Sequence, residues 1–303
     1  MSGWRIWLVG AGMAGGLALG VSAGTLEVDD LHVFRNLVVA DEVTRGGVPR
    51  EGLVLMCDFD DPAGVVGDVS GTLLPGTVCH VQWIPDGRIA GACRFNGLGA
   101  DTASRIEFAD APAIDIRGAL TLSAWIRPVA TKGITFCGII GKYRHEGINT
   151  KERSYVLQYH PKTRKVRLSI SGDGTKVVTV DSDVALTLGT WTHVAGTYEP
   201  GARMRLYING TPDSERTKSV PTAIHSAPAP LWIGQMGSTT WKSFPGDLDS
   251  CQVFARALPA VEIRELHAYT GTNFPPSSAR FASGVSYLHP LGDISMGIYT
   301  NGR

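Results

Sequence analysis

LTLSAWIRP, residues 120–128, is the stretch that decides the fold. Leu120, Leu122, Ala124 and Ile126 fall on one side of an extended chain, and the intervening residues fall on the other. This period of two indicates a β-strand with one face in an apolar core. Further segments of strand character occur at the spacing of a β-sandwich: residues 53–60, 155–159, 166–170, 176–180, 190–198, 204–208 and 231–233.

Turn signals separate these segments, and no long helical pattern interrupts them. SGDG at residues 171–174 and Asn209-Gly210 are typical of tight turns between antiparallel strands. The economical arrangement is an all-β fold of two antiparallel sheets packed face to face, ending in a short C-terminal helix. That helix is predicted to begin at Leu258-Pro259 and to cover one face with three apolar residues: Val261, Ile263 and Leu266.

The composition suits a folded chain without a strongly charged face. Of the 303 residues, 43% are hydrophobic and 18% are charged, which argues against disorder. Lysine plus arginine and aspartate plus glutamate both number 28, so the formal net charge is zero. No nucleic-acid partner is expected, because such a partner would need a basic face.

Residues 1–23 have the three-part pattern of a secretory signal peptide. Arg5 supplies a short positive start, the stretch from Ile6 to Val21 is uncharged, and small residues precede cleavage after Ala23. The alternative is an uncleaved anchor, but the apolar stretch is shorter than the roughly 20 residues of a spanning helix. We therefore expect an exported protein (extracellular, cell-surface or periplasmic) with no membrane span after cleavage.

The remaining chain divides into three segments. Residues 24–51 form a stalk or linker with strand character, residues 52–270 form the sandwich, and residues 271–303 form a C-terminal tail with two strand-like stretches. Strand addition through the stalk and the tail would give a homo-oligomer. The alternatives are a plain linker, and a tail that packs back on the sandwich or stays disordered.

Five cysteines occur, so at least one cannot pair within the chain. Cys79 and Cys93 flank the turn Pro85-Asp86-Gly87. A hairpin closed on these three residues would place the two cysteines opposite each other, within reach of a cross-strand disulfide. The alternative is that both are small buried hydrophobic residues.

In their order along the chain, these motifs resemble the laminin-G-like jelly-roll domains of the concanavalin A-like superfamily, over roughly residues 53–269. The resemblance implies a jelly-roll sandwich, and it names no ligand. Asn96 stands where the family usually has aspartate. The matching motifs are DFDD (58–61), DVSG (68–71), GACRFNG (91–97), TLSAWIRP (121–128), IIGK (139–142), WTHVAGTY (191–198), LYING (206–210) and FPGDLD (244–249).

The resemblance also implies a calcium site, because relatives often hold a structural calcium ion where the first strand approaches the last, or at the sandwich rim. The candidate ligands are Asp58, Asp60 and Asp249, with Asp247 in reserve. Strand alternation would place Asp58 and Asp60 on one face, and calcium takes six to eight oxygen ligands. The alternative is solvated acids that prevent edge pairing.

Two loops are candidate ligand contacts. Trp241 and Lys242 stand among small polar residues before the last strand, and Tyr143 and Arg144 begin a second polar loop. An exposed aromatic ring can stack on a sugar face while neighbouring donors bind its hydroxyls. The alternative is that each aromatic residue anchors its own loop.

Catalysis is not expected. Residues 53–258 contain no strand of alternating acids such as retaining glycosidases use, and no nucleophile elbow, zinc helix or phosphate-binding loop. Trp125, Trp191 and His193 are interpreted as structural. Two function classes remain: a binding or adhesion module for carbohydrate or another extracellular polymer or protein, and a structural subunit of a surface assembly.

Overall fold

The computed structural model describes the backbone of residues 5–10 and 17–22, together with residues 48–270 apart from 62–67, 73, 100–101, 131–135, 145–150 and 238–242. The chain divides into two compact units, Met1–Arg45 and Gly46–Arg303.

The first unit contains an antiparallel hairpin. β1 (Arg5–Gly10) pairs with β2 (Leu17–Ser22), and Gly10 lies opposite Leu17. The hairpin falls in the segment predicted to be a signal peptide, and cleavage after Ala23 stays a prediction. Within the described part of the chain, no helix is long and apolar enough to cross a membrane. Most of the predicted stalk and the whole predicted tail lie outside the described residues.

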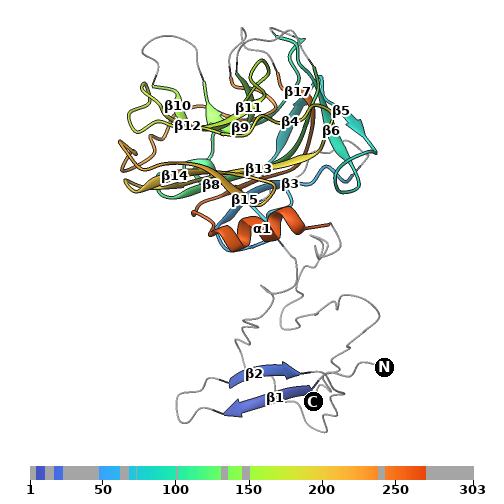
Figure 1. The fold of residues 1–303 in the computed structure, drawn as a ribbon, viewed down its shortest axis with the longest axis vertical. Helices are drawn as coiled ribbons and strands as arrows, with labels where there is room; N and C mark the ends of the chain where they lie inside the picture. The colour runs from blue at the N-terminus through green and yellow to red at the C-terminus, as the bar shows by residue number, and fades with distance from the viewer. Residues whose placement is uncertain are drawn as a thin grey trace. The chain divides into compact units, whose positions relative to one another are not determined.

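The second unit is a sandwich of two antiparallel sheets, which confirms the predicted fold class (Figure 1). One sheet has seven strands in the order β12-β11-β10-β9-β16-β7-β4. These strands are β4 (Gly76–Cys79), β7 (Arg105–Phe108), β9 (Cys137–Tyr143), β10 (Arg153–His160), β11 (Lys165–Ile170), β12 (Val178–Asp181) and β16 (Leu231–Ile233).

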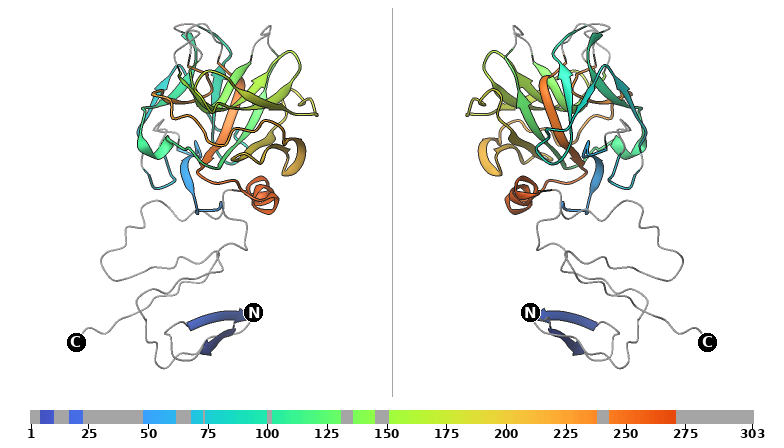
Figure 2. Two further views of the ribbon diagram at one scale, coloured as in Figure 1. Left: turned by 90° about the vertical axis from the view of Figure 1, so that its left-hand side faces the viewer. Right: turned by 90° about the vertical axis from the view of Figure 1, so that its right-hand side faces the viewer.

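The other sheet has eight strands, in the order β15-β14-β13-β8-β17-β6-β5, with β3 also paired to β17. These strands are β3 (Leu53–Cys57), β5 (Gln82–Ile84), β6 (Ala92–Asn96), β8 (Leu120–Pro128), β13 (Thr192–Glu199), β14 (Arg203–Ile208), β15 (Thr211–Arg216) and β17 (Pro245–Phe254). A short 3-10 helix, η3 (Pro112–Ile114), precedes β8. Figure 2 shows β17 (orange) in the middle of its sheet, where β8 flanks one edge and β6 and β3 share the other.

Alternate residues of the strands fill the core between the sheets. Leu122 and Ile126 of β8 are fully buried with Leu157 and Leu168 of the opposite sheet. Each such side chain stabilises the fold by about 1.5–3 kcal/mol through removal of apolar surface from water. The residues between them, such as Trp125, point to the outer face of the sheet, as the period of two predicts.

A helix covers part of that outer face. α1 (Ala260–Ala268) packs on the eight-stranded sheet, and Ile263 and Leu266 are buried against Tyr207 and Phe254 (Figure 1). The expectation that Val261 shares this face is wrong, because Val261 is 49% exposed. Residues two apart on a helix point in nearly opposite directions, so Val261 cannot face the sheet together with Ile263.

The expected pairing of Cys79 with Cys93 is also wrong. β4 ends at Cys79 and pairs with β7, so Cys79 lies opposite Arg105 in the seven-stranded sheet. The chain then changes sheets at His80, which has a left-handed φ of 52°. β5 pairs with β6 and places Trp83 opposite Cys93. Both cysteines are thiols on different sheets.

Candidate functional site

The first two predicted calcium ligands follow the end of β3. The strand ends at Cys57, and Phe59 takes a left-handed φ of 60°. The alternation that was expected to direct Asp58 and Asp60 to one face therefore stops before either residue. Asp58 accepts hydrogen bonds from backbone N–H groups of its own turn. Asp60 Oδ1 accepts one from Gly91 N at 3.3 Å.

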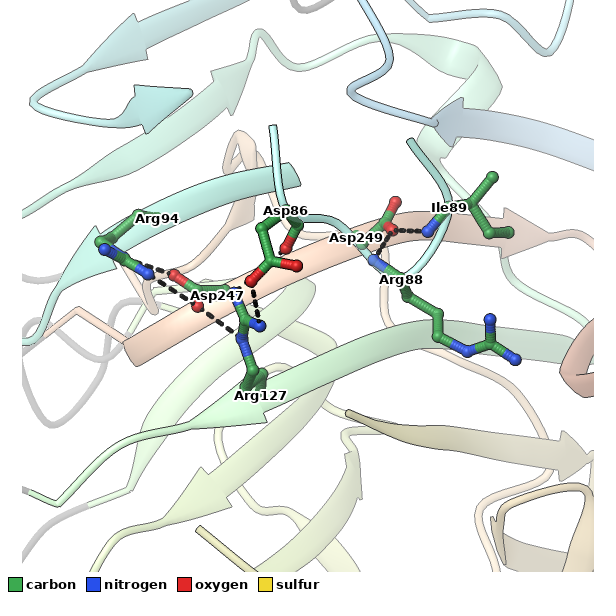
Figure 3. A network of polar contacts seen from close by, with 7 residues as sticks. All are labelled: Asp86, Arg88, Ile89, Arg94, Arg127, Asp247 and Asp249. Atoms are coloured by element: carbon green, nitrogen blue, oxygen red, sulfur yellow. Dashed lines mark hydrogen bonds and ion pairs between the residues drawn. The ribbon is translucent and has the colours of Figure 1, made fainter. Parts of the chain in front are cut away.

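Asp249 of β17 holds the loop between β5 and β6 (Figure 3). Its Oδ2 accepts hydrogen bonds from Arg88 N at 2.8 Å and Ile89 N at 2.9 Å, and Ser250 Oγ donates to its Oδ1. Burial raises the pKa of Asp249 to about 7, and repulsion from Asp60 adds to the rise. Asp249 is therefore partly protonated at neutral pH although it is well hydrogen-bonded.

Electrostatic repulsion links the three aspartates: Asp58 acts on Asp60, and Asp60 acts on Asp249. Burial raises the pKa of Asp60 to about 6 and repulsion from Asp58 adds to it, while burial also raises the pKa of Asp58. A cation among them would relieve this repulsion. However, among the described residues no three His, Cys, Asp or Glu side chains are placed to hold one metal ion. Calcium binding would therefore require these three carboxylates to move closer together than they stand in this structure.

Asp247 does not belong to this set. Arg94 Nε lies 2.7 Å from Asp247 Oδ1, and Arg127 Nε lies 2.9 Å from Asp247 Oδ2 (Figure 3). Arg127 also pairs with Asp86 across the hairpin loop at 2.8 Å. Two guanidinium groups thus neutralise the buried Asp247 carboxylate. The prediction of Asp247 as a reserve calcium ligand is therefore wrong.

The structure places the two described ligand candidates on the seven-stranded sheet. Tyr143, at the end of β9, is only 4% exposed and packs with Val156 and Met236 on the outer face of that sheet. Arg144 lies 5.8 Å from the Trp232 ring centroid and 3.8 Å from Glu152. Tyr143 therefore supports the surface rather than presenting a ring to solvent. Trp241 and Lys242 lie outside the described residues.

A group of side chains that the sequence reasoning missed lies on the same outer face. The Cζ of Arg167, on β11, is 4.1 Å from the centroid of the Phe136 ring, and the His160 ring stands edge-on to Phe136 at 4.6 Å. Asp181 of β12 holds Arg167 through two hydrogen bonds. Phe136, His160 and Arg167 are all half-buried. We call Phe136, His160, Arg167 and Asp181 the Phe136 patch.

Buried polar groups continue this surface toward β9. Gln158 accepts a hydrogen bond from Ser169 Oγ at 3.0 Å, and both residues lie between the Phe136 patch and Met236 on the outer face. No local motif marks the patch, because its four members come from three strands and a loop. The outward positions of β10 and β11 were the only signal that could have found it.

The outer face of the eight-stranded sheet is closed where α1 lies. Trp125 is 4% exposed and stacks on His267 of α1 at 5.3 Å, with the Arg88 guanidinium at 4.5 Å from its ring. His193 Nε2 is 2.9 Å from Ser123 Oγ, and burial lowers the pKa of His193 to about 3. Trp125 and His193 are structural, as their strand positions suggested.

The family model for the concanavalin A-like lectin/glucanases superfamily, of the laminin G type, matches residues 100–264. The chain belongs to this superfamily. This domain is 30% identical over 127 residues to pentraxin-related protein PTX3 of Bos taurus. The match covers 38% of this chain and 32% of the pentraxin, so the chain spans about a third of that relative.

Solved structures share the fold of this superfamily member. The binding domain of Paraclostridial Mosquitocidal Protein 1 is 18% identical with a TM-score of 0.58, covering 72% of this chain and 52% of that one. The binding domain of Botulinum neurotoxin DC, in complex with rat synaptotagmin II, is 14% identical with a TM-score of 0.54, covering 72% and 51%. Domain 4 of AbnA, a GH43 extracellular arabinanase from Geobacillus stearothermophilus in complex with arabinotriose, is 21% identical with a TM-score of 0.51, covering 71% and 98%.

Proposed function

We propose that the protein is an exported, non-catalytic module that binds a carbohydrate or another extracellular polymer on the outer face of its seven-stranded sheet. The Phe136 patch is the observation that carries this proposal. It combines a half-buried aromatic ring with a guanidinium and an imidazole in contact with that ring. Such a combination suits a sugar ligand, because the aromatic ring covers the C–H groups of the sugar and the donors bind its hydroxyls.

The patch is held in place before any ligand arrives. Two hydrogen bonds to Asp181 fix the Arg167 guanidinium, and the buried Gln158–Ser169 pair fixes the polar floor beside it. Ordered side chains lose little further conformational entropy on binding, which favours affinity.

The relatives support a binding role. Toxin binding domains and an arabinanase domain in complex with arabinotriose have the same fold. For this chain we propose a carbohydrate ligand, and a protein receptor is the second ligand class. Arg144 is proposed as a further contact, because it follows β9 and lies beside the Trp232 ring. Trp241 and Lys242 lie outside the described residues, and their contact with a ligand stays a prediction from the sequence.

Substitution in the Phe136 patch tests the proposal. We expect Phe136→Ala and Arg167→Ala each to weaken binding of a polysaccharide, first identified on a glycan array, by about tenfold, or about 1.4 kcal/mol, in calorimetric titration. Arg205→Ala is the matched control. Arg205 forms a similar half-exposed cross-strand ion pair with Glu215, on the eight-stranded sheet.

Equal effects of Arg167→Ala and Arg205→Ala would contradict this location. An array without any bound glycan would contradict the carbohydrate class, and capture of a protein receptor would replace it. Release of reducing sugar from the bound polysaccharide would contradict the non-catalytic role.

Assembly is the second function that we propose, through the segments that flank the sandwich. The observation behind it is that both sheets end in described edge strands, among them β12 and β15. An edge strand presents unpaired backbone groups that a strand from another copy can bind.

A structural calcium ion is a separate proposal, restricted to Asp58, Asp60 and Asp249.

A further inference from the structure

Three cysteines meet inside the sandwich, where β3 and β6 share one edge of β17. Cys57 ends β3, Cys93 lies in β6 and Cys251 lies in β17. All three are free thiols in this structure, belong to the apolar core and are at most 3% exposed. The three cysteines take no part in the proposed binding surface, because that surface lies on the outer face of the other sheet.

Strand register distinguishes one pair among the three. Cys57 lies directly opposite Cys251 in the antiparallel pairing of β3 with β17. Directly opposed residues have Cα atoms roughly 4.5–5.5 Å apart, which falls within the roughly 4.4–6.8 Å that a disulfide spans. Cys93 is opposite Leu248 on β17 and Trp83 on β5, so it faces no cysteine in register.

We propose that Cys57 and Cys251 form a disulfide that joins the first and last strands of the sandwich, with export to an oxidising compartment as the condition. Two thiols lose two protons and two electrons and form one S–S bond. A disulfide oxidant, either a small molecule or a thiol oxidoreductase, takes up the electrons and is reduced to two thiols. Cys93 stays a thiol, in keeping with the odd number of cysteines.

The bond must form while the chain is folding. In the folded protein Cys57 is 1% exposed and Cys251 is fully buried, so an oxidant cannot reach either sulfur directly. Because the thiolate is the attacking species, buried thiols of the folded protein react slowly with an oxidant. Before β17 adds to the sheet, both thiols are accessible.

The test compares two refolding conditions for the full chain. The protein is unfolded in urea with reductant and refolded either in a glutathione redox buffer or in dithiothreitol. We expect non-reducing peptide mass spectrometry to find the Cys57–Cys251 linked peptide only after the first treatment. The linked form should melt roughly 5–15 °C higher than the reduced form, because the bond closes a loop of almost the whole sandwich.

Variants separate this pair from the other thiols. Cys57→Ser and Cys251→Ser should each remove the linked peptide and the difference in melting temperature between the two conditions. Cys79→Ser is the control, because Cys79 lies in the other sheet, and it should keep both. Folded, reduced protein exposed to the same glutathione buffer should stay unlinked for hours.

Two results would overturn the proposal. One is separate alkylation of Cys57 and Cys251 after oxidative refolding of the unaltered chain. The other is a linked peptide that joins Cys93 or Cys79 to another cysteine instead. Neither readout uses a ligand, so a failure of the proposed binding function would leave this test unaffected.

Discussion

Buried aspartates of this sandwich are stabilised by different neighbours. Asp68, in the DVSG motif, accepts hydrogen bonds from the backbone N–H groups of Met56, Ser70 and Leu74. Asp247 is neutralised by two arginines, whereas Asp249 has backbone and hydroxyl donors but no cation. At Asp249, burial raises the pKa by more than these hydrogen bonds lower it.

The raised pKa of Asp249 predicts a pH dependence of stability. The folded state holds a proton on Asp249 up to about pH 7, whereas the unfolded chain releases it near pH 4. Stability from this group is present at low pH and is lost as pH rises through about 7. We expect Asp249→Asn to remove about 1–3 kcal/mol of pH dependence between pH 5 and 8, measured by urea unfolding.

The same titrations test the calcium proposal. Calcium bound at Asp58, Asp60 and Asp249 would raise the urea midpoint at pH 8, where the carboxylates are ionised, and Asp249→Asn would remove the gain. A midpoint unaffected by calcium would end that proposal. An unchanged pH slope in Asp249→Asn would contradict the assignment of the titrating group.

At the scale of elements, close strand contact decides which residues the sheets accept. Gly141 of β9 lies opposite Val156 of β10, and a Cβ atom there would be 2.5 Å from Tyr155 O and from Val156 Cα. These are backbone atoms of a paired strand, so they cannot move aside without breaking the pairing. Gly118, which precedes β8, would place a Cβ atom in open space.

This contrast predicts different effects of the same substitution. Gly141→Ala should destabilise the protein by about 1–3 kcal/mol, because it forces β9 and β10 apart. Gly118→Ala should change stability by no more than about 0.5 kcal/mol. Urea unfolding followed by tryptophan fluorescence measures both, and equal midpoints would show that the sheet adjusts without cost.

Sheet membership was the part of the element-level prediction that failed. Of the hairpin predicted around Pro85-Asp86-Gly87, the part formed by β5 and β6 is present, but the chain changes sheets at His80, so Cys79 pairs with β7 instead. A left-handed residue at one position redirects a strand, and nothing in the alternation of apolar residues reports such a change. Alternation predicts which face a residue takes, not which strand becomes its neighbour.

At the scale of the whole molecule, the sandwich forms a unit separate from the N-terminal residues. We expect a fragment of residues 46–270 to unfold at the same urea midpoint as the full chain, because every described residue of the core between the sheets lies within it. In static light scattering, the full chain should show concentration-dependent assembly that deletion of 24–48 or 271–303 removes. Identical masses for the full chain and the fragment at all concentrations would contradict the assembly proposal.

The sequence by itself determined the fold class, the family resemblance and the structural roles of Trp125 and His193. These follow from local alternation and motif order, which short stretches of chain carry. Only the tertiary structure decided that Asp247 pairs with arginines, that Phe136 meets Arg167, and that Cys57 faces Cys251. Each of these contacts joins residues on different strands or loops, and their proximity depends on sheet order and register. The stretch 120–128 therefore predicts a strand and its buried face, but its neighbours β17 and β13 are set by the packing of the whole sandwich.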